Sequence, residues 1–412
     1  MLKTDKNKHR SDLLILSAIL VLMVIGLITI YAIGPMRANV LNNTYGSDYD
    51  SNYFFLNQLR SILLSLAAFF LTFKLIKYNW AKKLSKPLLI FALFLSALLW
   101  ILSLAGSSLA KCELGECRWF NLGFVSFQPA EVLKIALIVY LADFLSRKKE
   151  EGTIGKIRDF WLPFLTVCGL SLIFVVIIQG DLGTGVAIVA IMFAMLLAAG
   201  LPLKQYIIFT LITIICAVGA VVTSSHRMER VNAWLDTLTG AESSDSTYHV
   251  ENAMLAIGTG GMFGVGIGNS VQATGYLPES INDSIFAILG ETFGFFGLFF
   301  ILMIFGTILM RTLKIASYTP EPDNRLYIIG VFAWFFAQVV VNIMAMTGLV
   351  PVTGITLPFL SYGGTSMIFL SAAMGFVLQF SCYTSREVIK NENIDSRGRL
   401  GGTHHSSRRR SA

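Results

Sequence analysis

The chain has 412 residues, of which 55% are apolar and only 14% are charged, and its formal net charge is +7. Several windows of about 20 residues carry no charge, and this is the length that a helix needs to cross a bilayer. The basic residues are scattered over short loops without an aromatic and basic groove pattern, which argues against a nucleic-acid partner. The composition therefore predicts an all-α polytopic membrane protein.

Ten apolar stretches are expected to form membrane-spanning helices. They cover residues 13–33, 61–76, 87–104, 129–145, 160–178, 182–200, 206–223, 285–309, 326–347 and 365–380. An even number puts both termini on one side, and most of the 32 Lys and Arg residues then share that side, which the positive-inside rule places in the cytoplasm. We expect a cytoplasmic N-terminus (1–11), a membrane domain (12–383) and a disordered basic tail (384–412) attracted to anionic lipid.

The only long polar segment in the middle of the chain is predicted to be a large extracytoplasmic loop, residues 224–284, between the seventh and eighth helices. It ends with Glu279 and Asp283, at the edge of an apolar run. A carboxylate at a helix N-terminus faces unpaired N–H groups, so Asp283 should stay ionised and is a candidate proton acceptor. Capping is a nearly equal alternative, because residues 282–284 also fit an ordinary N-cap cluster.

Two further features lie at membrane depth. Glu131 and Lys134 are three residues apart in the fourth predicted span, so they share a helix face and can pair. Ions inside a span are costly and more often mark function than structure. Residues 348–364 are too rich in Gly and Pro for a helix and too apolar for a solvated loop, which favours a re-entrant or cavity-lining segment over a buried interfacial loop.

Other signals are weak. Cys112 and Cys117 share an outer loop, where a disulfide and two free thiols are equally compatible with the sequence. The glycines of 258–264 have the spacing of a dinucleotide fingerprint but no preceding strand, so we interpret them as a bend. The sequence shows no metal-ligand spacing and no Ser-His-Asp or Cys-His arrangement for covalent catalysis.

Five motifs together closely resemble the SEDS family of shape, elongation, division and sporulation proteins. They are 127–131 (FQPAE), 179–184 (QGDLGT), 266–272 (GIGNSVQ), 276–287 (YLPESINDSIFA) and 348–366 (GLVPVTGITLPFLSYGGTS). The resemblance runs from the first span to the tenth, and 266–279 look more like the division members than the elongation members. The chain departs from the family pattern at Gly180, Ala130 and Ser284, where Pro, Ser and Phe are common. Thr292 replaces the second acid after Glu291, which argues against a role for paired acids there.

The resemblance implies a peptidoglycan glycosyltransferase at the division septum that polymerises lipid II on the outer face of the cytoplasmic membrane. It also implies a class B penicillin-binding protein and other division proteins as partners. Asp283 matches the acid that is essential for polymerisation in the family, and residues matching Arg118, Glu131 and Lys134 line the same cavity. The motifs supply the remaining substrate-binding candidates, which are Gln128, Asp181, Glu279, Ser361 and Tyr362.

The chemistry agrees with these residues. Direct attack of the acceptor 4-hydroxyl on the α-linked donor inverts the anomeric centre, so one general base suffices, and Asp283 is our choice. Arg118 and Lys134 are the best candidates for the leaving pyrophosphate, and Arg227 and Arg230 are weaker ones. A divalent cation (Mg or Mn) is an optional helper, and no other cofactor is expected. A lipid II flippase and a scaffold that recruits the division transpeptidase are the alternatives.

Overall fold

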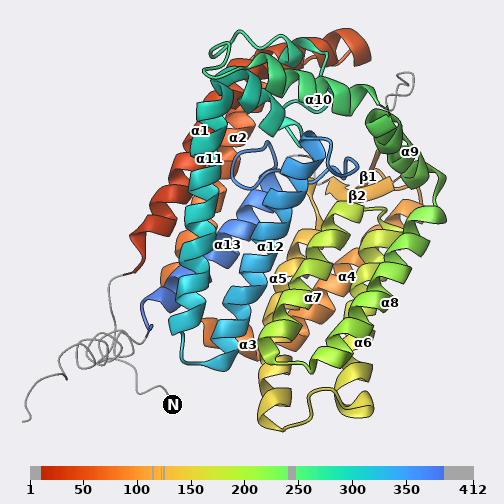
Figure 1. The fold of residues 1–412 in the computed structure, drawn as a ribbon, viewed down its shortest axis with the longest axis vertical. Coiled ribbons are helices and arrows are strands. Elements are labelled where there is room, and N and C mark those ends of the chain that lie inside the picture. The colour runs from red at the N-terminus through yellow and green to blue at the C-terminus, as the bar shows by residue number, and fades with distance from the viewer. Residues whose placement is uncertain (1–10, 114–115, 122, 124–125, 240–246, 385–412) are drawn as a thin grey trace, which may run out of the picture.

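The computed structural model describes residues 11–113, 116–121, 123, 126–239 and 247–384. Helices dominate it, and most run along one long axis (Figure 1). This confirms the all-α membrane class. The α-helices are α1 (Leu13–Tyr45), α2 (Tyr53–Phe70), α3 (Tyr78–Lys83), α4 (Ser85–Leu104), α5 (Pro129–Glu150), α6 (Leu162–Leu172), α7 (Leu182–Ala199), α8 (Leu203–Val222), α9 (Ser225–Thr239), α10 (Tyr248–Thr259), α11 (Ile285–Tyr318), α12 (Pro322–Met346) and α13 (Gly364–Ser381).

Within the described residues, nine helical segments are long and apolar enough to cross a membrane. They correspond to nine of the ten predicted spans. Two of them include π-helical turns that continue or precede an α-helix: η1 (Leu71–Leu75) follows α2, and η2 (Ile157–Trp161) and η3 (Ile173–Ile178) flank α6. The segments are Leu13–Thr44, Tyr53–Leu75, Ser85–Leu104, Ile157–Ile178, Leu182–Ala199, Leu203–Val222, Ile285–Tyr318, Pro322–Met346 and Gly364–Ser381.

The tenth predicted span, 129–145, lies in α5, a 22-residue helix that also carries Glu131, Lys134, Asp143 and Arg147. Almost every side chain in its first four turns is buried, because α4, α7, α12 and α13 pack around it. A helix that faces protein on all sides can carry polar groups without exposing them to lipid. The count of ten spans therefore stays a prediction.

The two ends of the described membrane domain lie together. The backbone N–H of Asp12 donates to Ser381 Oγ (3.1 Å), and the Asp12 carboxylate pairs with Arg311 (2.7 Å). In Figure 1 this is the lower end of the bundle, and α9, α10 and a small sheet lie at the upper end. This arrangement agrees with the prediction that both ends share one side of the membrane. Residues 1–10 and 385–412, which hold most of the predicted termini, lie outside the described residues.

The upper end contains structure that the sequence did not predict. Residues 224–284 include α9, α10 and the short 3₁₀-helix η4 (Gln272–Thr274), and residues 105–128 include an antiparallel sheet in the order β1-β2-β3. The strands are β1 (Ala110–Glu113), β2 (Glu116–Asn121) and β3 (Ser126–Phe127). Cys112 and Cys117 face each other across β1 and β2 and form a disulfide. Of the two alternatives left open by the sequence, a disulfide and two free thiols, the structure therefore has the disulfide.

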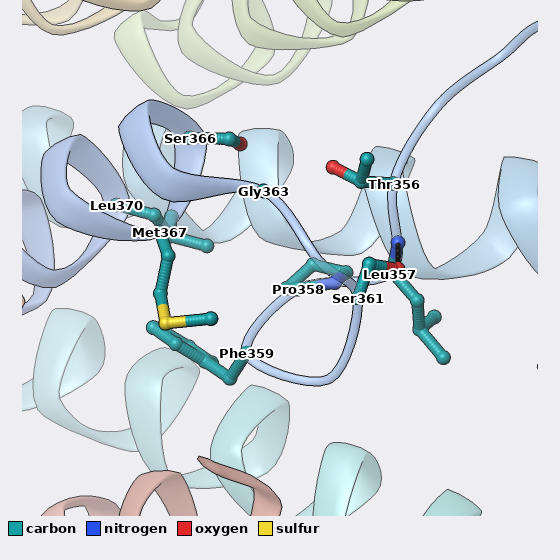
Figure 2. Close-up of a pocket in the computed structure, with 9 residues that line it drawn as sticks. All are labelled: Thr356, Leu357, Pro358, Phe359, Ser361, Gly363, Ser366, Met367 and Leu370. Atoms are coloured by element: carbon teal, nitrogen blue, oxygen red, sulfur yellow. Dashed lines mark hydrogen bonds between the residues drawn. The ribbon is translucent and has the colours of Figure 1, made fainter. Parts of the chain in front are cut away.

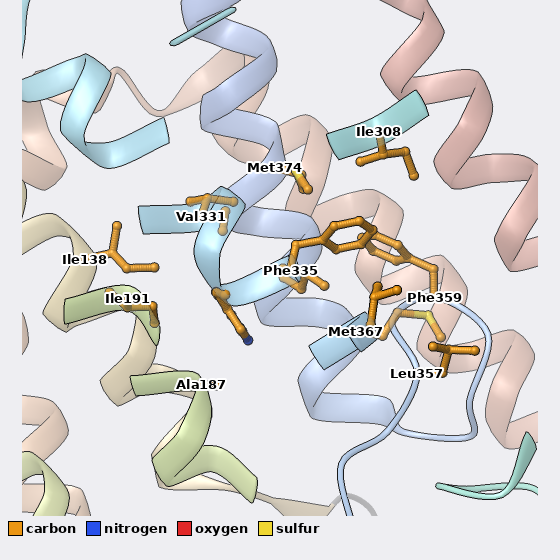
Figure 3. Packing of buried hydrophobic residues seen from close by; sticks show 14 of the residues in the cluster. Ile138, Ala187, Ile191, Ile308, Val331, Phe335, Leu357, Phe359, Met367 and Met374 are labelled. Carbon is orange, nitrogen blue, oxygen red and sulfur yellow. The ribbon is translucent and has the colours of Figure 1, made fainter. Parts of the chain in front are cut away.

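Residues 347–363 are irregular, as predicted, and their second half is buried, with Ile355 and residues 357–361 buried between α12 and α13. Phe359 has φ 64°, and this tight turn is closed by the Leu357 N–H, which donates to Ser361 Oγ (2.7 Å). Figure 2 shows the turn against the first turns of α13, where the two elements line a small pocket. Figure 3 shows Phe359 beside Phe335 of α12 inside the apolar core (ring centroids 6.0 Å apart). The second half of the irregular segment is therefore part of the core, where protein satisfies its backbone.

The glycine-rich bend packs on α11. Gly294 interrupts α11 with φ 66°, and the N–H groups of Val265 and Gly266 donate to the carbonyls of Glu291 and Thr292 (2.9 and 3.1 Å). A Cβ at Gly260 would lie 2.0 Å from the carbonyl oxygen of Gly290, so only glycine fits this approach. The bend thus brings the end of the outer segment back to the start of α11, where Asp283 lies.

Candidate active site

Asp283 lies in the loop of residues 276–284, two residues before α11 begins. Its side chain is buried, with 7% of the residue exposed, and no donor among the described residues reaches its Oδ1. The next residue, Ser284, is the N-cap position, but its hydroxyl donates to the Pro278 carbonyl (2.8 Å) and makes no cap bond. The capping interpretation of this cluster therefore loses its main support.

The surroundings of Asp283 raise the pKa of its carboxyl group. Burial and, second, the negative charge of Glu279 raise the pKa of Asp283 to about 7, against the opposing effects of nearby backbone N–H groups and of Arg230. A carboxyl group with a pKa near the working pH can both accept and release a proton efficiently. The side chain that the sequence selected thus has the electrostatics of a general base.

His249 of α10 supports the same loop. Its Nε2 lies 2.7 Å from Ser284 Oγ, and because that hydroxyl already donates its single proton to Pro278, the imidazole must be the donor. Burial, helped by the charge of Arg230, lowers the pKa of His249 to about 4. The ring is therefore neutral at pH 7 and carries its proton on Nε2. Ser284, a departure from the family pattern, makes this contact available.

Two arginines face the acids from different elements. Arg230 of α9 donates to the Val352 carbonyl (3.3 Å). Burial and the charge of Arg118 lower the pKa of Arg230, and Glu116, Asp283 and Asp181 act in the opposite direction. Since such charge effects fall off with distance, the charged groups that act on Arg230 lie close to it. This raises Arg230 above the rank that the sequence gave it.

Arg118 of β2 lies against the turn before α7. It donates to the carbonyls of Gln179 (3.2 Å) and Gly180 (3.0 Å), and it pairs with the Glu116 carboxylate. Gly180 has φ 68°, and a Cβ there would lie 2.1 Å from Glu116 Oε1. Glycine at this family proline position therefore makes room for Glu116, which the sequence analysis did not select.

Gln128 and Asp181 form one wall of the site. Asp181 caps α7 by accepting from the Thr184 N–H (2.9 Å), and its Oδ2 accepts from Thr184 Oγ1 (2.7 Å) and from Gln128 Nε2 (2.9 Å). Both oxygens are thus already satisfied by protein donors. We expect Asp181 to hold the wall in place more than to bind substrate.

Glu131 and Lys134 pair as predicted, with 2.8 Å between Glu131 Oε1 and Lys134 Nζ. Only 1% of Lys134 is exposed, and its Nζ also lies 4.6 Å from the centroid of the Trp334 ring on α12. No donor among the described residues reaches Glu131 Oε2. No hydrogen bond in the described chain joins this pair to Asp283, so the structure does not link the pair to Asp283 directly.

The last three sequence candidates support the loop of Asp283. Glu279, with φ 48°, pairs with Arg37 of α1 (2.9 Å) and accepts from Asn282. Ser361 accepts from the Leu357 N–H, and the Tyr362 N–H donates to the Ile281 carbonyl (2.8 Å). These contacts connect α1, the 276–284 loop and the 347–363 segment.

The structure therefore brings most sequence candidates to one end of the bundle and adds Glu116, Arg37 and Asn342. Asn342, together with Trp334 and Gln338, forms a polar stripe at i, i+4 and i+8 on α12, and this spacing in an apolar span was a usable signal. Arg227 lies outside this group, because it donates to the carbonyls of Ala220 in α8 and Val176 in η3. Across the described residues, no three His, Cys, Asp or Glu side chains gather as a metal site.

Comparison with known sequences agrees with this arrangement. Residues 12–386 match the family of FtsW, RodA and SpoVE, described as cell cycle protein. The chain is 35% identical over 382 residues to stage V sporulation protein E of Bacillus subtilis strain 168, which covers 92% of this chain and 99% of the relative. It is 32% identical over 352 residues to the probable peptidoglycan glycosyltransferase FtsW of Aliivibrio salmonicida, with 84% and 85% covered.

Solved structures share the fold. Rod shape determining protein RodA of Thermus thermophilus superposes with a TM-score of 0.62 at 25% identity, covering 91% of this chain and 98% of the other. A chain from a structure described as the structural coordination of polymerization and crosslinking by a peptidoglycan synthase complex gives a TM-score of 0.69 at 24% identity, covering 90% and 97%.

Proposed function

The chain belongs to the FtsW, RodA and SpoVE family, the SEDS proteins, and on this premise we propose that it is a peptidoglycan glycosyltransferase that polymerises lipid II into glycan strands. It is a multi-pass membrane protein, and the site around Asp283 faces the extracytoplasmic side. The observation that carries the proposal is the state of Asp283: a buried carboxyl group whose Oδ1 has no donor among the described residues and whose pKa is raised to about 7, at the position of the essential acid of the family.

The reaction needs one proton acceptor. The acceptor 4-hydroxyl attacks C1 of the donor sugar, a new C–O bond forms there, and the bond from C1 to the phosphate oxygen breaks. Polyprenyl pyrophosphate leaves with the bonding electrons, and Asp283 takes the hydroxyl proton. The configuration at C1 inverts, and no covalent enzyme intermediate is required.

Positive charge stabilises the leaving group. Arg118 and Arg230 lie at the same end of the bundle as Asp283, and Lys134 supplies a buried cation. Such fixed charges are most effective in a site that excludes water. Glu116 and Glu131 hold Arg118 and Lys134 before substrate binds, so the cations are not left unpaired in the apo protein.

A divalent cation fits this site only in a limited way. Magnesium is usually bound by one or two carboxylates together with substrate phosphates. Asp181 is satisfied by protein donors, and Asp283 must keep its free oxygen for the acceptor proton, so these two aspartates do not fit a metal. The pyrophosphate of lipid II would have to supply the oxygens for Mg or Mn, which would neutralise charge on the leaving group.

We further propose that a class B penicillin-binding protein and other division proteins are the partners and that the chain acts at the division septum. One support is the division-like sequence of residues 266–279. Another is that the FtsW relatives are named probable peptidoglycan glycosyltransferases, and that a neighbour in fold comes from a complex combining polymerization with crosslinking. A fluorescently tagged copy should gather at the septum. A signal spread evenly along the side wall would contradict the division role.

The test of activity uses purified protein, its penicillin-binding partner and lipid II. Glycan chains resolved by gel electrophoresis support the polymerase. Transport of lipid II across vesicles without chain formation would support a flippase, and neither activity would support a scaffold.

A further inference from the structure

Three segments meet at Asn342, which lies near the end of α12 and is 1% exposed. Its side-chain amide donates to the carbonyl of Asp283 (2.7 Å) and to the carbonyl of Ile355 (2.7 Å). An amide group has two N–H donors, so both bonds form at once. The opposite orientation would place Oδ1 against two carbonyl oxygens, so the chemistry fixes which atom is nitrogen.

Both acceptors need an external donor. At the start of α11 the first N–H groups, those of Ala287 and Ile288, donate to the Ser284 carbonyl, and the Asp283 carbonyl lies just outside this ladder. Ile355 lies in the irregular 347–363 segment, where the backbone forms no helix or sheet ladder that would supply a donor to its carbonyl. A buried carbonyl without a donor is costly. Asn342 satisfies both carbonyls from a rigid helix.

The contact acts on the residue that carries the chemistry. A bond to the Asp283 carbonyl restrains the backbone from which the Asp283 carboxyl group projects. The same loop is tied to the 347–363 segment by the Tyr362 N–H, which donates to the Ile281 carbonyl (2.8 Å). Asn342 therefore closes a triangle between α12 and these two segments.

We propose that Asn342 is a positioning residue that fixes the Asp283 carboxyl group in its buried orientation by anchoring the Asp283 backbone and the 347–363 segment to α12. The inference rests on the proposed function, since it concerns the general base of that reaction. Asn342 itself does not touch the reacting atoms. Its effect passes through Asp283.

Loss of this anchor has an effect that simple destabilisation lacks. The charged groups that act on Asp283 are Glu279 of its own loop, which raises its pKa, and Arg230 of α9, which lowers it, while neutral His249 of α10 contacts the neighbouring Ser284. Burial is the largest effect. A loop freed from Asn342 admits water to the carboxyl group, so its pKa falls toward the ordinary value of an aspartate.

The experiment compares Asn342→Leu with Gln379→Met. Gln379 has the same chemistry at the opposite end of the bundle, where its amide donates to the carbonyls of Thr72, Phe73 and Ile76. Asn342→Leu should lower kcat at least about tenfold with little change in KM, and it should move the acidic limb of the pH–rate profile to lower pH. Gln379→Met should lower the thermal midpoint and leave kcat and the limb unchanged.

A second readout does not require activity. Dicyclohexylcarbodiimide modifies protonated buried carboxyl groups, so the pH dependence of labelling at Asp283, followed by mass spectrometry, reports its titration directly. The labelling midpoint should be lower in Asn342→Leu than in wild type. Asn342→Thr, which keeps one donor, should give an intermediate labelling midpoint. It replaces Asn342→Leu in the experiment if the leucine variant does not fold.

Equal midpoints in wild type, Asn342→Leu and Asn342→Thr would overturn the positioning role, and so would an equal shift in Gln379→Met. If the wild-type protein makes no glycan chains, the proposed function fails. The labelling result still decides whether Asn342 positions Asp283.

Discussion

The buried pair of Glu131 and Lys134 allows a quantitative test of what the intramembrane charges do. Its atoms are 2.8 Å apart, both side chains are almost fully buried, and the ammonium also lies 4.6 Å from the Trp334 ring centroid. Lys134→Met removes the cation and keeps much of the volume. It leaves the Glu131 carboxylate buried with no cation beside it.

The expected cost follows from these contacts. Breaking a buried pair by removing one partner costs about 3 to 5 kcal/mol, because the remaining charge is uncompensated. The lost cation–π contact accounts for about 2 kcal/mol of this when it is desolvated. Replacing both partners by apolar residues of similar size is often nearly neutral, so Glu131→Leu with Lys134→Met should restore most of the stability, within about 1 kcal/mol of wild type.

Reversible unfolding in mixed SDS micelles, followed by tryptophan fluorescence, measures these differences. The single variant should unfold at lower SDS than the double variant. Polymerisation should stay low in both, because neither has a cation at this position for the pyrophosphate. A single variant as stable as wild type, or a double variant no more stable than the single one, would refute the reasoning.

Two other predictions concern the upper end of the bundle. The rate of polymerisation by the wild-type protein should rise as the pH increases through about 7, because only the ionised Asp283 accepts a proton and its pKa is raised to about 7. Initial rates that stay flat from about pH 6 to 8 would contradict this. Gly180→Ala should lower the free energy of unfolding by about 1 to 3 kcal/mol, because alanine is strained at φ 68° and its Cβ would meet Glu116. The control Gly219→Ala, in an open position of α8, should not lower it. Equal unfolding curves for the two variants would show that the turn at Gly180 is not constrained.

The membrane helices were predictable from the sequence because their signal is local. A run of about 20 apolar residues must either span the membrane or be buried in the protein, whatever it packs against. The end of the first helix was placed too early, at residue 33 before Pro35, but α1 continues to Tyr45. Proline removes one backbone donor and is tolerated where neighbours pack against the helix, here α2 and the 3₁₀-helix η4.

The structure of the outer segments was missed because distant residues stabilise it. In α9, Arg230 and Trp234 donate to the carbonyls of Val352 and Gly348, more than 100 residues away in the chain. A short polar helix held by such contacts has no strong periodic signal of its own. The small sheet likewise has short strands and depends on its disulfide and on contacts with α4.

The active-site residues divide in the same way. Asp283, Arg118 and Lys134 were selected from residue type and motif. The structure pairs Arg118 and Lys134 with carboxylates, whereas burial raises the pKa of Asp283 to about 7, so the prediction that Asp283 simply stays ionised was wrong. The supporting contacts could not be read from the sequence, since Arg37 pairs with Glu279 across 242 positions and Asn342 reaches Asp283 across 59. Such contacts depend on the packed fold.

The most direct measurement is lipid II polymerisation by Asp283→Asn in complex with the proposed penicillin-binding partner. Asparagine keeps the size of the side chain but cannot take a proton, so the rate should fall by about two to four orders of magnitude. Burial penalises the ionised form of Asp283, which is why its pKa is raised, and this form dominates above pH 7. Because asparagine carries no charge, the variant should be at least as stable as wild type at pH 8.

The matched control is Asp323→Asn, another buried aspartate at a helix start, which pairs with Lys82 at the far end of the bundle and should keep its activity. An inactive, folded Asp283→Asn beside an active Asp323→Asn is the predicted result. A folded Asp283→Asn that makes glycan chains at near wild-type rate would contradict the assignment of Asp283 as the general base.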